Sequence, residues 1–168
     1  MLYSQNADKR AMKLSNPLGY ISVPFQSNID FNIKPNNGFK WTMYLMPIIP
    51  FSANKNFNVI NRIVVPVIYQ NDIFKNKSQT GISDILINSF LSPKNCPVVW
   101  GIGPALNIPI GFPEELTTKK WGLGPNIIAM KTSGRLIIGA LLFHLWSVSG
   151  SDTRPDYSFT YFQPVSLY

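Results

Sequence analysis

Apolar and polar residues alternate along most of the chain with a period of two. In "YISVPFQSNIDFNI", residues 20–33, the odd positions from Ile21 to Ile33 are mostly apolar, and the even positions from Ser22 to Asn32 are mostly polar. Successive side chains of a β-strand point to opposite faces of the sheet. The alternation therefore predicts a strand with one apolar and one polar face.

The same pattern continues along the chain and predicts eight strands, near residues 19–33, 39–51, 57–70, 81–92, 97–110, 120–131, 135–148 and 158–168. Strands of soluble proteins have about 5–6 residues, whereas a tilted strand that crosses a bilayer needs about 9–11. The expected fold is all-β, an antiparallel up-and-down membrane β-barrel or most of one. We expect residues 16–168 to form the barrel and residues 1–15 an N-terminal extension.

The connections between these strands differ in length in a regular way. The first, third, fifth and seventh are "KPNNG", "NDIFKNKSQT", "GFPEELTTK" and "SGSDTRPDY", and the others are "SANKN", "SPKNC" and "TSG". In a meander, alternate connections lie at the same end of the sheet. Outer-membrane barrels have short periplasmic turns and longer external loops, and all these connections except the short "KPNNG" fit that rule.

Two similar motifs, "WGIGP" at 100–104 and "WGLGP" at 121–125, lie within two neighbouring predicted strands. In both strands bulky residues alternate with small or polar residues, so the two groups are expected on opposite faces of the sheet. On a barrel, the bulky face would meet lipid and the glycines would face a crowded lumen or bend the strand. Pro104 and Pro125 each remove a ladder donor, and we expect a bulge at each.

The four tryptophans lie within about four residues of a predicted strand end, where membrane barrels place aromatic rings at the two interfaces. The alternative is that they cap a soluble core. These candidate interface residues are Trp41, Trp100, Trp121 and Trp146.

Composition narrows the class of protein. Only 14% of the residues are charged, against about 25% in typical soluble domains. The net charge is +7, but the basic residues are scattered, which argues against a nucleic-acid interface. The single cysteine, Cys96, excludes an internal disulfide. The longest apolar run, residues 136–148, is shorter than the ~20 residues of a spanning helix, and the first residues contain no apolar stretch typical of a secretory signal.

Seven ordered segments carry a resemblance to a known family: "NPLGYISVPFQSNIDFNI", "LMPIIPFSANKNFNVINRIVVPVI", "GISDILINSFLSP", "WGIGPALNIP", "KWGLGPNIIAM", "GALLFHLWSVSG" and "FQPV". Over residues 16–168 the chain resembles the bacterial outer-membrane β-barrel transporters related to phenol-degradation-pathway outer-membrane proteins. The resemblance implies an outer-membrane location and passive, porin-like transport of small molecules, apolar ones included. Members of that family have a signal peptide and further strands, so closure by these eight strands is an open question.

The sequence contains little material for catalysis or metal binding. It has one histidine, His144, which lies between Phe143 and Leu145, so triads and zinc sites are not expected. "GIG" and "GLG" lack the rest of a dinucleotide fingerprint. We therefore expect no enzyme activity, no cofactor and no metal.

Four charged residues are expected on the same face of the predicted sheet. Asp30, Lys40, Arg62 and Asp84 all occupy even positions of the first four predicted strands, together with several polar residues. In a barrel this face would line the lumen. The four side chains would either pair into an ion network or be solvated independently.

The expected function is that of an outer-membrane barrel whose partners are the lipid bilayer and a small solute. The alternative is a soluble β-barrel or β-sandwich that binds a hydrophobic ligand. The two differ in whether the bulky face of the strands meets lipid or packs in a core.

Overall fold

The computed structural model of the chain describes residues 21–73, 77–94 and 96–167. The proposed extension 1–15, residues 19–20 of the first expected strand, and Lys75 in the third connection lie outside these residues. The strands are β1 (Phe25–Ile33), β2 (Gly38–Leu45), β3 (Ile48–Ser52), β4 (Phe57–Asn71), β5 (Ser78–Ile82), β6 (Ile85–Pro93), β7 (Val98–Ile108), β8 (Lys120–Ser133), β9 (Leu136–Gly150) and β10 (Ser158–Leu167). A short 3₁₀ turn, η1 (Glu114–Leu116), lies between β7 and β8.

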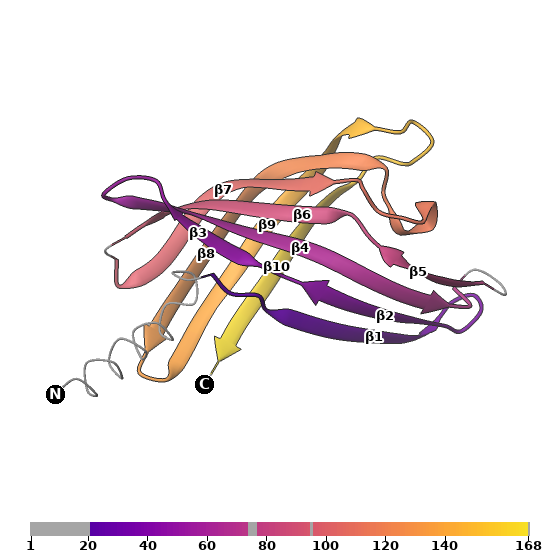
Figure 1. Cartoon of the computed structure of the whole chain (residues 1–168), viewed down its shortest axis with the longest axis horizontal. Helices are drawn as coiled ribbons and strands as arrows, with labels where there is room; N and C mark the ends of the chain where they lie inside the picture. Colours follow the sequence, from indigo (N-terminus) through magenta and orange to yellow (C-terminus); the bar gives the residue numbers. More distant parts are fainter. Residues whose placement is uncertain (1–20, 74–76, 95, 168) are drawn as a thin grey trace.

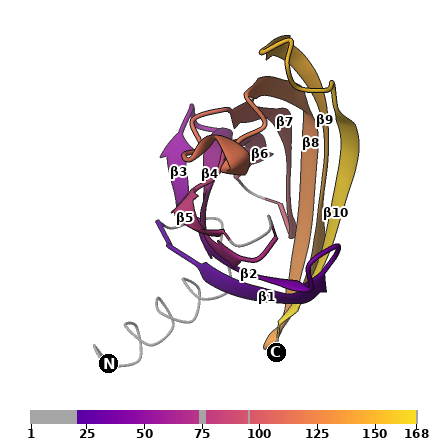
Figure 2. The same ribbon diagram turned by 90° about the vertical axis from the view of Figure 1, so that its right-hand side faces the viewer.

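The strands form one antiparallel sheet in the order β1-β2-β4-β6-β7-β8-β9-β10, with β3 and β5 also paired to β4. This arrangement confirms the predicted all-β meander. The sheet curls into a half-barrel, and the described parts of β1 and β10 are its two edges (Figures 1 and 2).

Two of the eight expected strands are each divided in two. β2 and β3 pair with β4 in one continuous register and are separated by Met46 and Pro47. β5 and β6 also share β4, but Ile82 pairs with Val67 and Leu86 with Val64, so four steps along one strand oppose three along the other. The extra residue forms a bulge at the break that contains Asp84.

The connections alternate between the two ends of the sheet, as the meander requires, and those at one end are longer except for 34–37, which has four residues. Residues 34–37, 72–77, 109–119 and 151–157 join strands at one end of the sheet, and 53–56, 94–97 and 134–135 join them at the other. Figure 1 shows these two sets at opposite ends. The loop 109–119 carries η1 over the mouth of the curled sheet (Figure 2).

The inner face of the sheet holds a packed apolar cluster. Its members are Ile60, Phe90, Ala105, Ile128, Leu141, Phe143 and Leu145, each at most 7% exposed. Strand parity predicted the small and polar residues of the inner face, but not how much of this face is apolar. Polar residues lie among the apolar ones, and Thr42, Gln70, Asn88 and Asn126 are all buried.

The two Gly-Pro pairs occupy matching positions in adjacent strands. Pro104 lies opposite Pro125 in the β7–β8 pair. Pairing is interrupted between β6 and β7 beside Pro104, and between β8 and β9 beside Pro125, yet the register is the same on both sides of each gap. The predicted bulges at these prolines are therefore wrong, because the missing N–H groups open the ladder without inserting a residue. The bulge between β8 and β9 lies instead opposite Trp121 and Gly122, which pair with Ser149 and Ser147, so the extra residue is Val148 in β9.

Candidate functional site

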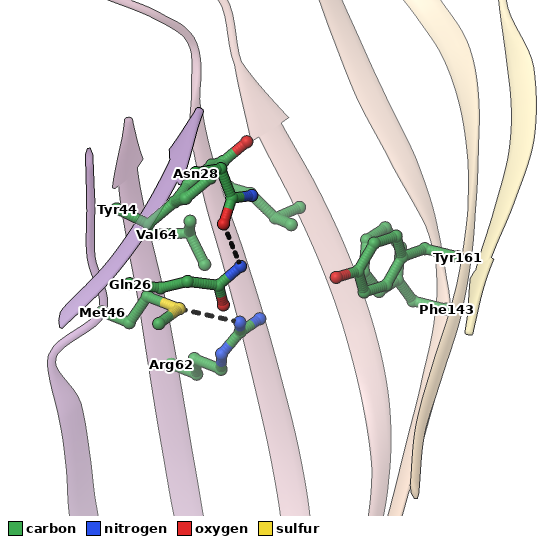
Figure 3. Close-up of a pocket in the computed structure, with 9 residues that line it drawn as sticks. Gln26, Asn28, Tyr44, Met46, Arg62, Val64, Phe143 and Tyr161 are labelled. Carbon is green, nitrogen blue, oxygen red and sulfur yellow. Dashed lines mark hydrogen bonds between the residues drawn. The ribbon is translucent and has the colours of Figure 1, made fainter. Parts of the chain in front are cut away.

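A cavity of about 220 Å³ lies inside the curled sheet. Its walls come from both halves of the chain, so that residues from β1, β2, β4 and β6 face residues from β9 and β10 (Figure 3). The lining residues are Gln26, Asn28, Tyr44, Met46, Arg62, Val64, Leu86, Phe143 and Tyr161. The curl of the sheet thus brings together segments that are more than a hundred residues apart in the sequence.

Among the described residues that line this cavity, Arg62 is the one charged side chain. Its position in β4 is directly opposite Asn88 in β6, and its Nη1 donates a hydrogen bond to Asn88 Oδ1 at 3.2 Å. Nη2 donates to Met46 Sδ at 3.1 Å. These two contacts hold the guanidinium at the cavity wall, and Figure 3 shows the one with Met46.

The remaining walls divide into polar and apolar parts. Gln26 Nε2 donates to Asn28 Oδ1 at 3.0 Å, so β1 presents a short amide pair to the cavity. Opposite it, Tyr161 stacks on Phe143 with ring centroids 5.0 Å apart. Val64 and Leu86 complete an apolar side. The cavity is therefore amphipathic, with one cation.

The four charged residues predicted for the lumen are not joined into a network. Asp30 and Lys40 are direct cross-strand neighbours. The described residues contain two ion pairs, Lys119–Glu114 and Lys120–Asp156, and neither involves this set.

Asp84 has a different role from the one that strand parity predicted for it. It is 7% exposed at the β5–β6 break, where Oδ2 accepts hydrogen bonds from Thr118 N at 2.8 Å and Thr118 Oγ1 at 2.5 Å. Oδ1 accepts one from Gly111 N at 3.3 Å. Asp84 thus fastens the loop 109–119 at the mouth of the sheet.

The structure places all four tryptophans near strand ends. Trp100, Trp121 and Trp146 are 41%, 42% and 49% exposed on the outer face. Trp41 is partly exposed, and its Nε1 donates to Ser27 Oγ at 2.8 Å. Trp100 lies towards the end of the sheet with connections 53–56, 94–97 and 134–135, and the other three lie towards the opposite end. Whether these rings contact a lipid interface remains a prediction.

A second polar cluster at the mouth was missed by the sequence analysis. Lys120, 8% exposed at the start of β8, forms an ion pair with Asp156, with Nζ and Oδ1 2.6 Å apart. Hydrogen bonds from Lys120 and then Ser147 lower the pKa of Asp156, while burial raises the pKa of Tyr157 beside it. No spacing in the sequence links residues 36 positions apart, so only the pairing of β8 with β9 could reveal this contact.

His144 lies in the outer face and not in the core. Its Nδ1 is 2.8 Å from Thr160 Oγ1 and its Nε2 is 3.2 Å from Ser158 Oγ, while its ring centroid lies 4.2 Å from that of Trp146. The part of the chain that the structure describes holds no group of three or more His, Cys, Asp or Glu residues suited to a metal ion. No described helix is long and apolar enough to cross a membrane.

Comparison of the chain with protein-family models, curated proteins and solved structures finds no match. The resemblance to the outer-membrane transporter family therefore stays a prediction.

Proposed function

We propose that this chain is a membrane-inserted β-barrel protein of the bacterial outer membrane, and that small solutes pass along its inner face. The observation that carries the proposal is the apolar outer surface of the curled sheet. Ile102, Leu123, Ile127, Ile138 and Val148 are each 45% or more exposed on three consecutive strands, and Trp100, Trp121 and Trp146 flank them. Soluble monomers rarely expose a continuous apolar surface of this kind, whereas lipid covers one at no cost.

The inner face supports the transport part of the proposal. The cavity beside Arg62 offers hydrogen-bonding and apolar groups to a solute, and a second hollow of about 330 Å³ lies at the mouth, beside Asp84 and Tyr157. Polar inner walls tune which solutes a barrel accepts. Solutes would enter past loop 109–119, which is fixed by Asp84.

One observation favours a second candidate. The apolar cluster around Phe90 and Phe143 fills the interior next to the cavity, as the core of a soluble β-barrel or β-sandwich does. Such a protein would bind a hydrophobic ligand in the cavity. It would then have to keep its exposed apolar outer surface in water.

A pair of arginine substitutions on the outer face of β8 tests the membrane proposal. Ile127 lies in the middle of the strand and Ser133 at its end, and both side chains are on the outer face. Ile127→Arg should lower the free energy of unfolding in lipid by about 2–4 kcal/mol, and Ser133→Arg by about 0–1 kcal/mol. Urea titration of folded protein in vesicles measures both values. Equal tolerance of the two substitutions, or cooperative folding of the monomer without detergent or lipid, would favour the soluble alternative.

A further inference from the structure

We propose that the inner cavity binds a small organic carboxylate, with the carboxylate on Arg62 and a short apolar body against Val64, Leu86 and Phe143. This inference names the class of solute that would permeate. It rests on the proposed function only where passage of that solute through the barrel is concerned. Binding itself requires the cavity alone.

The first argument is charge. Within the described residues no carboxylate oxygen lies within 4.0 Å of Arg62, because both ion pairs involve other residues. Asp84, the acid expected on the same face of the sheet as Arg62, accepts hydrogen bonds from Thr118 and Gly111 instead. A partly buried cation has lost part of its hydration, and an anion bound beside it offsets the free-energy cost of that loss.

The second argument is hydrogen bonding. A guanidinium has five N–H donors, and the contacts with Asn88 and Met46 account for two of them. Asn88 itself is fully buried, and its Nδ2 has no hydrogen-bond partner in the described structure. A carboxylate offers two acceptor oxygens in the planar arrangement that arginine binds best. An alcohol or an amine does not.

The third argument is size and shape. A volume of about 220 Å³ is below the ~300–1,000 Å³ typical of drug-sized ligands. The ligand is therefore short. Gln26 and Met46 lie beside the guanidinium of Arg62, whereas the stacked Phe143–Tyr161 pair lies across the cavity from them (Figure 3). An aliphatic or single-ring body fits this wall, and a long acyl chain does not.

Isothermal titration calorimetry on the full chain in zwitterionic micelles tests the inference, with empty micelles as the blank. The probes are hexanoate, 1-hexanol and hexylammonium. We expect hexanoate to bind at least tenfold more tightly than hexanol and hexylammonium to bind weakest. Arg62→Met should weaken hexanoate binding at least ~30-fold while leaving hexanol unchanged. Arg135→Met removes the same charge from the exposed β8–β9 turn and should have no effect.

Two further results keep the inference testable if Arg62→Met does not fold. Leu86→Trp fills the cavity and retains Arg62, so it should abolish hexanoate binding. In the unaltered chain, equal affinity for hexanoate and hexanol, or tighter binding of hexylammonium, would overturn the carboxylate assignment, as would no binding of any probe. Hexanoate binding without solute uptake in liposomes would support this site and reject permeation.

Discussion

At the scale of single residues, the glycines of the two Gly-Pro pairs lie where a side chain would collide with a neighbouring strand. A Cβ at Gly103 would overlap the carbonyl oxygen of Ser89, and one at Gly124 would overlap that of His144. The prolines next to them face gaps in the ladder. Close backbone approach thus explains why each motif has glycine at this position inside a strand.

We therefore expect Gly124→Ala to destabilise the fold by about 1–3 kcal/mol or more, because backbone atoms of β9 cannot move aside as a flexible side chain does. Ala129→Gly, in the same strand, is the control and should cost about 0.5–1 kcal/mol. Thermal unfolding in micelles, followed by circular dichroism, compares them. A Gly124→Ala variant as stable as the unaltered chain would contradict the packing described for this strand pair.

Residue parity predicted the inner position of Arg62 but not its surroundings. Successive side chains of a strand point to opposite faces of the sheet, so the alternation of apolar and polar residues predicts the face on which each side chain lies. Its contacts depend on which strands pair and in what register. Asn88 meets Arg62 through the β4–β6 pairing, and Met46 meets it from the break between β2 and β3, both of which pair with β4. Neither fact can be read from spacing in the sequence.

At the scale of elements, the loop 109–119 is attached along its length to the break between β5 and β6. Besides the contacts of Asp84, Ser83 Oγ donates to Leu116 O at 2.6 Å, and Phe112 exchanges two backbone hydrogen bonds with Ile82. Arg154 Nη2 donates to Glu114 O at 2.8 Å and joins this loop to the next one, 151–157. The loop is therefore a structured cover of the mouth.

Removal of Asp84 should release that cover. Asp84→Ala deletes a buried acceptor of three loop hydrogen bonds and should cost about 1.5–3 kcal/mol locally. We expect faster tryptic cleavage after Lys119, measured by mass spectrometry of timed digests. Glu115→Ala, at an exposed position of the same loop, leaves the Asp84 contacts and the Lys119 ion pair in place and serves as the control. Equal cleavage rates for the two variants would mean that Asp84 does not hold the loop.

The Lys120–Asp156 pair predicts a pH dependence for the loop 151–157. The lowered pKa of Asp156 means that its stabilising contribution is present above the ordinary carboxyl pKa of 3.8 and is lost as pH falls through the lower folded value. Protonation would leave the buried Lys120 without its counter-ion. We expect amide protons of residues 151–157 to exchange faster, relative to the rest of the chain, below about pH 4. Asp156→Asn should remove this relative change, and Asp152→Asn should retain it.

At the scale of the whole molecule, the sequence predicted the eight-strand meander because every strand has the same period and every connection is local. It did not predict the divided strands, since the break at Met46–Pro47 and the bulge at Asp84 depend on how both halves pair with β4. The alternation of apolar and polar residues also does not predict whether the two edge strands pair to close a barrel. The described edges, β1 and β10, both line the cavity but do not pair with each other.

The separation of long and short connections predicts how the molecule is oriented in a membrane. Asp152 lies in a long connection and Lys55 in a short one, at opposite ends of the sheet. Outer-membrane barrels place long loops outside the cell and short turns in the periplasm.

Because Cys96 is exposed, it must first be replaced by serine. Single cysteines are then introduced as Asp152→Cys and Lys55→Cys, in the chain exported behind a secretory leader. An impermeant maleimide should label position 152 in intact cells, and position 55 only after lysis. The reverse pattern would invert the orientation, and labelling of neither position after lysis would place both outside the accessible surface. Labelling of both positions in intact cells would show that this sheet does not span the outer membrane, which would leave its apolar outer face to be covered by protein instead of lipid.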